Sequence, residues 1–175
     1  FSQGATTATG RSLDLALEGN AFFMVQTPQG LRATRDGRFT LGSNGQLEAM
    51  DGAQLMGKNG QPIRLDPAAG NPTIDPDGNV TQAGNALGQL DLRSYADSTL
   101  LSRTGSNRYD PGTAAQVAPK AKVQQGYLEQ SGVDVASTMV DMIRLNRLFE
   151  MSLKVASTVT NDLDSRSISD IANSR

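Results

Sequence analysis

The chain has 175 residues, which is enough for one domain with a real hydrophobic core. Its 16 lysines and arginines against 18 aspartates and glutamates give no bulk charge that would hold nucleic acid or an anionic membrane. Cysteine and histidine are both absent, which excludes disulfides, thiolate metal sites, and the commonest general base and metal ligand of enzymes.

The first eleven residues differ in composition and pattern from those that follow. Residues 1–11 are small and polar without a period, which predicts a flexible connector. From Ser12 the segment SLDLALEG alternates leucine with other residues, the period-two pattern of a half-buried strand. AFFMVQ, TPQG and LRATR then read as a strand, a turn and a second strand, so we expect a β-hairpin there.

Turn-forming pairs recur along the next fifty residues. They are Asp36–Gly37, Asn44–Gly45, Asp51–Gly52, Asn59–Gly60 and Asp77–Gly78. Asn-Gly and Asp-Gly readily take positive φ at the centre of tight turns, so each pair is expected to reverse the chain. The regular reversals predict a meandering antiparallel sheet that closes into a small β-barrel or a sandwich-like domain.

The last part of this region is less regular. Residues 86–95 resume the alternation and predict a strand, whereas 96–120 are expected to wrap the sheet as an extended loop. Residues 121–131 predict the last strand of a β-rich domain that spans 12–131. The fold class is therefore mainly β (α+β), completed by a C-terminal helix.

That helix is predicted over 133–165, followed by a tail at 166–175. Apolar residues recur there at helical spacing, and neither glycine nor proline interrupts them. We expect the following residues to form a subunit-assembly surface: Val135, Met139, Met142, Ile143, Leu145, Phe149, Leu153, Ala156, Val159 and Leu163. No run reaches the roughly 20 apolar residues of a membrane helix, so no membrane insertion is expected.

The helix is too long for the domain that precedes it. At 1.5 Å per residue it extends about 50 Å, roughly twice the height expected of the sheet. Either the helix packs along its own domain and frays at its tip, or its apolar stripe pairs with another helix. The second interpretation is favoured, because an uncovered stripe of this length is typical of an association surface. The chain begins at Phe1 rather than methionine, so the partner is expected in a missing N-terminal part or in neighbouring copies.

Nothing in the sequence favours catalysis, a metal or a cofactor. Residues 75–79 (DPDGN) carry acidic oxygens but lack the spacing of a calcium loop, so a β-turn is predicted. Asp36, Asp51, Asp75 and Asp77 occupy turn positions, where aspartate bonds its own backbone. Ser152 and Lys154 are two residues apart on a helix and do not face each other.

Three arginines are spaced along the predicted hairpin region. Arg32, Arg35 and Arg38 are interpreted as a solvated edge that discourages strand aggregation. The alternative is a polar contact with a neighbouring subunit.

Two long segments resemble one known family. LDLALEGNAFFMVQTPQG followed by TRDGRFTLGSNGQL is similar to the segment shared by flagellar rod and hook proteins. GYLEQSGVDVASTMVDMIRLNRLFEMSLKVAST resembles the C-terminal signature of the same family. The resemblance spans most of 12–160. RLFE at 147–150 is closer to the proximal rod members than to the distal ones, while Asn20 and Gly132 depart from the usual pattern.

The resemblance implies a non-enzymatic structural subunit of the bacterial flagellar basal body. Such a protein would leave the cell through the flagellar type III apparatus and polymerise in the periplasm into the driveshaft between motor and hook. Its partners would be other copies, other rod and hook proteins, and a missing N-terminal helix. The alternatives left open are a distal rod or hook-type paralogue, a periplasmic β-rich module that binds cell-wall carbohydrate, and, more remotely, a carboxylate hydrolase.

Overall fold

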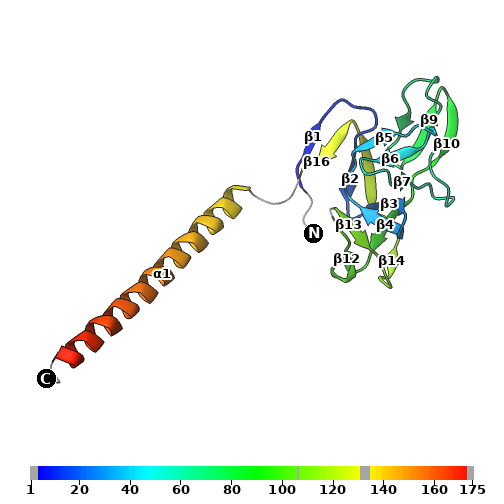
Figure 1. The fold of residues 1–175 in the computed structure, drawn as a ribbon. Coiled ribbons are helices and arrows are strands. Elements are labelled where there is room, and N and C mark those ends of the chain that lie inside the picture. The colour runs from blue at the N-terminus through cyan, green and yellow to red at the C-terminus, as the bar shows by residue number, and fades with distance from the viewer. Residues whose placement is uncertain (1–3, 106, 131–134, 173–175) are drawn as a thin grey trace. The chain divides into compact units, whose positions relative to one another are not determined.

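The chain forms two compact units, Phe1–Gly132 and Val133–Arg175, here called the β unit and the helix unit (Figure 1). The computed structural model describes residues 4–105, 107–130 and 135–172, with helix side chains described over 139–157. The described strands all lie in the β unit, and the helix unit contains one long helix.

The β unit is built from short strands. They are β1 (Thr6–Ala8), β2 (Leu15–Gly19), β3 (Phe22–Thr27), β4 (Gly30–Thr34), β5 (Phe39–Leu41), β6 (Leu47–Ala49), β7 (Gln54–Leu55), β8 (Thr73–Ile74), β9 (Asn79–Gln82), β10 (Asn85–Gln89), β11 (Leu92–Tyr95), β12 (Ser102–Arg103), β13 (Arg108–Asp110), β14 (Gln116–Val117), β15 (Ala121–Gln125) and β16 (Tyr127–Glu129). A short 3-10 turn, Ser98–Leu100, precedes β12.

The strands pair into several antiparallel sheets. The largest runs β12-β13-β4-β3-β7-β6-β5, and β11 joins it by pairing with β3 on one side and with β14 on the other. Smaller sheets are β10-β9-β8, β15-β2 and β1-β16. The mainly β prediction is confirmed. The barrel or sandwich is not, because no sheet in the described part of the chain closes on itself.

Most of the predicted turns join paired strands. β3 and β4 form the hairpin predicted around TPQG, with Thr27 opposite Gly30, and β8 and β9 pair across the Asp77–Gly78 turn. Two turns are exceptions: Asp36–Gly37 links β4 to β5, and Asn59–Gly60 lies between β7 and β8, and neither of these strand pairs is hydrogen-bonded. Gly37 is required for another reason: a Cβ there would lie 1.6 Å from the Leu15 carbonyl oxygen.

Three predicted segments are divided differently in the structure. Residues 86–95 form two strands rather than one, and 96–120 contain β12, β13 and β14 within the expected loop. The predicted last strand is split at Gly126, whose φ of 81° turns the chain so that β15 pairs with β2 and β16 pairs with β1. β1 itself lies inside 1–11, which was expected to be a flexible connector.

Two apolar clusters lie within the β unit. The larger contains Leu15, Leu17, Ala21, Phe23, Val25, Phe39, Leu47, Ala53, Leu55, Ile63, Leu65, Ile74, Val80, Leu90 and Val123. The smaller contains Phe22, Met24, Ala33, Met56, Tyr95, Leu101, Tyr109 and Ala114. The residues of β3 alternate between the two clusters, so this strand separates them and is buried on both faces.

The helix unit contains α1 (Val135–Ala172), 38 residues that would extend about 57 Å at 1.5 Å per residue. It continues past the predicted end at 165 because the next residues contain no glycine or proline. Within the described residues, no helix combines the length and apolar character needed to cross a membrane.

Candidate functional site

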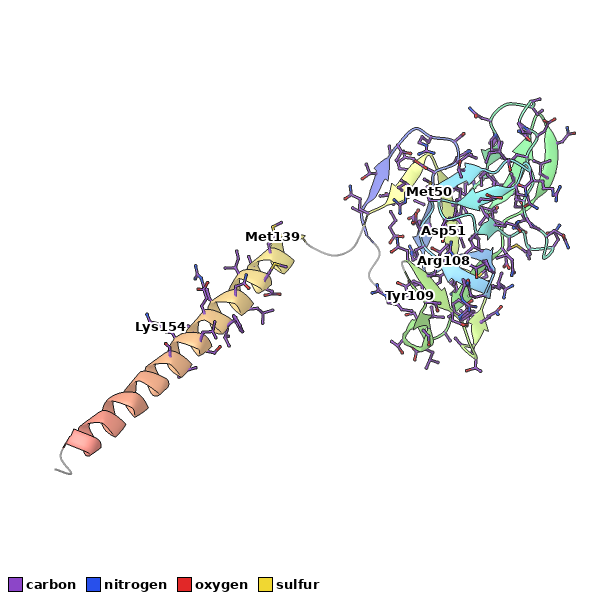
Figure 2. All side chains as sticks on the ribbon, viewed as in Figure 1. Met50, Asp51, Arg108, Tyr109, Met139 and Lys154 are labelled. Carbon is purple, nitrogen blue, oxygen red and sulfur yellow. The ribbon has the colours of Figure 1, made fainter. Side chains whose placement is uncertain are left out.

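The described side chains of α1 are exposed although many of them are apolar. Met139 and Lys154 mark this stretch in Figure 2. The exposed fractions are Met139 60%, Val140 47%, Met142 62%, Ile143 53%, Leu145 69%, Leu148 69%, Phe149 64%, Met151 68%, Leu153 54% and Val155 64%. Soluble proteins rarely leave so many large apolar side chains contiguous and uncovered, so α1 is the candidate assembly site.

Helix geometry sorts these residues into two groups. At about 100° per residue, four of them and the exposed Ala156 fall within about 80° of one another, at spacings of three and four residues. This group, here called the assembly seam, is Met142, Leu145, Phe149, Leu153 and Ala156. Spacings of three and four residues are those by which one helix packs against another.

The other residues predicted for the assembly surface lie beside the seam or have side chains outside the described residues. Met139 and Ile143 lie beside it, on the flank that also carries Glu150. The side chains of Val135, Val159 and Leu163 lie outside the described residues.

A second apolar line was not separated from the first by the sequence reasoning. Val140, Leu148, Met151 and Val155 lie about 140° around the helix from the seam, and Arg144 interrupts them. Arg144 forms an ion pair with Asp141, its Nη1 lying 3.5 Å from Oδ1. Placing residues at 100° per residue separates this second line from the assembly seam. A seven-residue repeat alone does not separate them.

The two serine hydroxyls within the described side chains of α1 bond to the helix backbone. The Ser152 hydroxyl donates to the Phe149 carbonyl at 2.7 Å, and the Ser157 hydroxyl donates to the Lys154 carbonyl at 2.8 Å. Such bonds to the preceding turn satisfy a serine within a helix. The pairing of Ser152 with Lys154 as nucleophile and base therefore has no geometric support.

Asp75 bonds within its own loop, as the sequence predicts. Asp75 Oδ1 accepts from the backbone N–H groups of Asp77 and Asn79, and Oδ2 accepts from the Asn79 side-chain amide at 2.8 Å. Asp51 pairs with Arg108, and these two residues lie together on the β unit in Figure 2. The carboxylate oxygens of Asp75 are thus occupied by the donors of the turn, which confirms the β-turn.

Asp75 gives a measurable consequence of this turn. The side-chain bond from Asn79, followed by the Asn79 backbone N–H, holds the pKa of Asp75 below 3.8. Since the folded pKa is the lower one, the stability contributed by this carboxylate is present above the unfolded pKa and is lost as pH falls through the folded value. NMR titration of the side-chain carboxyl should show the low pKa, and Asn79→Ala should raise it.

Asp97 provides the internal control for that titration. The Thr99 hydroxyl and then the Thr99 backbone N–H lower the pKa of Asp97 in a separate turn, so Asn79→Ala should leave it in place. A titration in which both carboxyls moved together would contradict a local origin of the Asp75 shift.

The three arginines do not form a solvated edge. Arg32 lies 3.3 Å from the Asp110 carboxylate, and its side chain is 15% exposed. Arg35 lies 2.8 Å from the Glu129 carboxylate, with only 18% of its side chain exposed. Arg38, 53% exposed and paired with Asp36, is the one that fits the expectation. Arg32 and Arg35 are instead largely covered because they pair with carboxylates far away in the sequence. No local sequence pattern encodes such pairs.

Two family descriptions match this chain. A model described as "Flagellar hook protein FlgE/F/G D1 domain" matches residues 16–82, and one described as "Flagellar basal body rod FlgEFG protein C-terminal" matches residues 124–169. The second range contains β16 and most of α1, including the whole assembly seam.

Curated relatives agree with these matches. The flagellar basal-body rod protein FlgF of Caulobacter vibrioides is 36% identical over 157 residues, covering 89% of this chain and 64% of the relative. The rod protein FlgG of Buchnera aphidicola subsp. Baizongia pistaciae is 33% identical over 183 residues, covering 95% of this chain and 68% of that protein. This chain belongs to the flagellar basal-body rod protein family. FlgG of Bacillus subtilis is likewise 33% identical, over 90% of the chain and 65% of the relative.

The names and the lengths of the relatives add two findings. The relatives are named as rod proteins rather than as enzymes, in agreement with the prediction that this chain has no catalytic role. The chain spans slightly under two thirds of the length of the rod proteins FlgF that it matches. Those relatives therefore contain residues with no counterpart here.

Proposed function

We propose that the chain is a structural subunit of the bacterial flagellar basal-body rod. In this function copies polymerise into the axial driveshaft that transmits torque from the motor to the hook. One observation carries the proposal beyond family membership: the seam on α1 presents Met142, Leu145 and Phe149 with more than 60% of each side chain exposed. An isolated helix with such a face is only weakly stable in water, and covering the face lowers its free energy.

The seam would act by packing against a helix from outside the two units described here. The occupants we propose are an N-terminal helix of the full-length protein, together with neighbouring copies and other rod and hook proteins. About a third of each relative's own length lies outside the part that matches, so their chains have room for such a segment. Head-to-tail contacts that do not close into a ring would extend the assembly as a helical filament.

The place of assembly follows from the same proposal. The subunit would reach the periplasm through the flagellar type III system and join the rod there. Relatives named FlgF and FlgG match at similar identity, 33–36%. The RLFE segment at 147–150 favours the proximal rather than the distal rod protein.

Electron cryomicroscopy of basal bodies in which this chain is traced would test the function. We expect Phe149 and Leu153 to be buried between helices of the central tube, and the β unit to lie outside it. A traced subunit whose α1 is covered entirely by its own β unit would contradict the proposal. Absence of the chain from basal bodies would contradict it too.

A further inference from the structure

The two ends of the β unit are tied together by one short ladder. β1 and β16 pair antiparallel, with Thr6 opposite Glu129 and Ala8 opposite Tyr127. The Gln130 N–H donates to the Ala5 carbonyl at 2.8 Å, which continues the ladder beyond the strands. This pair of strands, here called the stalk, joins the first and last strands of the β unit (Figure 1).

One end of the stalk is held by backbone bonds around Gly126. The Gly126 N–H donates to the Asp14 carbonyl at 2.7 Å, and the Gly126 carbonyl accepts from Thr9 N–H at 2.8 Å. The Thr9 hydroxyl donates to the buried Asp14 carboxylate at 2.7 Å. A single turn with a positive-φ glycine would act as a pivot if nothing held the other end.

The other end is held by one side chain. Arg35 Nε donates to Glu129 Oε2 at 2.8 Å, and Nη2 lies 2.8 Å from the same oxygen. The remaining donors reach carbonyls of β2 and of the turn after it: Leu17 at 3.2 Å, Gly19 at 2.8 Å and Ala21 at 2.9 Å. The guanidinium thereby makes four hydrogen bonds in addition to the Nη2–Glu129 ion-pair contact.

Glu129 also binds the segment that leads into β1. Its Oε1 accepts from the Gly4 N–H at 2.9 Å, while Oε2 is bound by Arg35. Space is tight at this point, because a Cβ on Gly4 would lie 1.9 Å from the Gln130 carbonyl oxygen. The carboxylate therefore joins the incoming strand, the outgoing strand and Arg35.

We propose that Arg35 is a positioning residue that fixes the direction of the stalk relative to the rest of the β unit. This inference rests on the proposed function, since direction matters only if the segment after Gln130 assembles with other helices. Among the described residues, hydrogen bonds hold the stalk at two ends: backbone bonds and the Thr9–Asp14 side-chain bond at Gly126, and Arg35 at Glu129; β16 also lies beside β2. Without Arg35 the stalk would swing about the Gly126 turn, and an applied load would bend it instead of being transmitted.

The geometry selects arginine over lysine at this position. Glu129 is 12% exposed at its side chain, so its charge must be satisfied by a partner at close range. A planar guanidinium can bind a carboxylate and several carbonyls at fixed angles, whereas an ammonium group has three donors and a flexible stem. Arg35→Lys should therefore retain part of the attachment, and Arg35→Met should lose it.

Distance measurement between spin labels would test the positioning directly. The chain has no cysteine, so Thr6→Cys, at the end of β1 away from Gly126, and Lys58→Cys in the β unit give two defined labels on exposed positions. We expect a narrow distance distribution in the labelled parent chain, a clearly broader one with Arg35→Met, and an intermediate one with Arg35→Lys. Arg38→Met, which removes the exposed pair with Asp36, is the matched control and should leave the distribution narrow.

Amide hydrogen exchange separates positioning from general stability. With Arg35→Met the Gln130 N–H should exchange about tenfold faster, while the Met24 N–H, bound to the Asp91 carbonyl within the sheet, keeps its protection. The Thr9 N–H, bound to Gly126 at the pivot, should also be retained. Equal acceleration at Met24 and Gln130 would indicate a merely structural role and overturn the inference.

The outcomes distinguish this inference from the function on which it rests. Unchanged label distances and exchange in both Arg35 variants would overturn the role of Arg35 and leave the assembly of α1 untouched. If Arg35→Met fails to fold, Arg35→Lys decides, and an unbroadened distribution in that variant would overturn the inference. The proposed function fails by a different result, which is normal rod assembly by a chain whose helix seam carries charges.

Discussion

Replacing both Met142 and Phe149 with glutamate should leave the β unit folded and abolish rod assembly. Each side chain would contribute about 1.5–3 kcal/mol when a partner helix covers it fully, so losing both weakens the contact at least ~100-fold. Burying two unpaired carboxylates adds a desolvation cost. Glutamate is a good helix former, so α1 itself is retained. Motility and electron microscopy of basal bodies report the assembly.

The matched control changes charge by the same amount at positions away from the seam. Arg147→Gln with Lys154→Gln lowers the net charge as much as the two glutamates do, but both positions lie roughly 140–160° around α1 from the middle of the seam. We expect this variant to swim and to form rods. Circular dichroism and β-unit NMR spectra should match the parent chain in both variants. Normal motility with Met142→Glu and Phe149→Glu would refute the assignment of these residues.

Short-range features of the fold were predictable because neighbouring residues determine them. The β3–β4 hairpin follows from a four-residue turn, and α1 follows from an apolar period uninterrupted by glycine or proline. The end of α1 was placed too early, since nothing in the sequence after 165 marks a stop.

Long-range pairing could not be read from local patterns. β1 consists of Thr6, Thr7 and Ala8, all exposed, and becomes a strand only because β16 returns beside it. The bond from Gly4 to Glu129 joins residues 125 positions apart. No period of two can indicate such a partner, because the strand has no buried face.

Burial of charged residues was the other limit. The alternating pattern predicts that Asp14 faces solvent, but it is only 1% exposed. Its carbonyl accepts from the Gly126 N–H, and its carboxylate accepts from the Thr9 hydroxyl beside that turn. Arg35 was grouped with Arg38 by spacing, although only Arg35 finds a distant carboxylate. The importance of a charged side chain depends on its tertiary partners, and these became visible only with the fold.

Replacing Phe23 with alanine should cause the largest loss of stability in the β unit. Phe23 and Phe39 are both 0% exposed, and their rings meet edge to face with centroids 5.3 Å apart. Removing a buried phenylalanine costs about 3–5 kcal/mol, because transfer free energy is lost and a cavity remains. That is a large share of the roughly 5–15 kcal/mol that stabilises a typical domain.

Urea denaturation followed by far-ultraviolet circular dichroism would measure this loss as a lower midpoint. Met50→Ala is the matched control, since Met50 is 67% exposed and its truncation should change the free energy of unfolding by no more than about 0.5 kcal/mol. Phe23 lies on β3, which pairs with β4, β7 and β11, so its loss loosens the centre of the largest sheet. A change below ~1 kcal/mol for Phe23→Ala would contradict the close packing of Phe23 against Phe39.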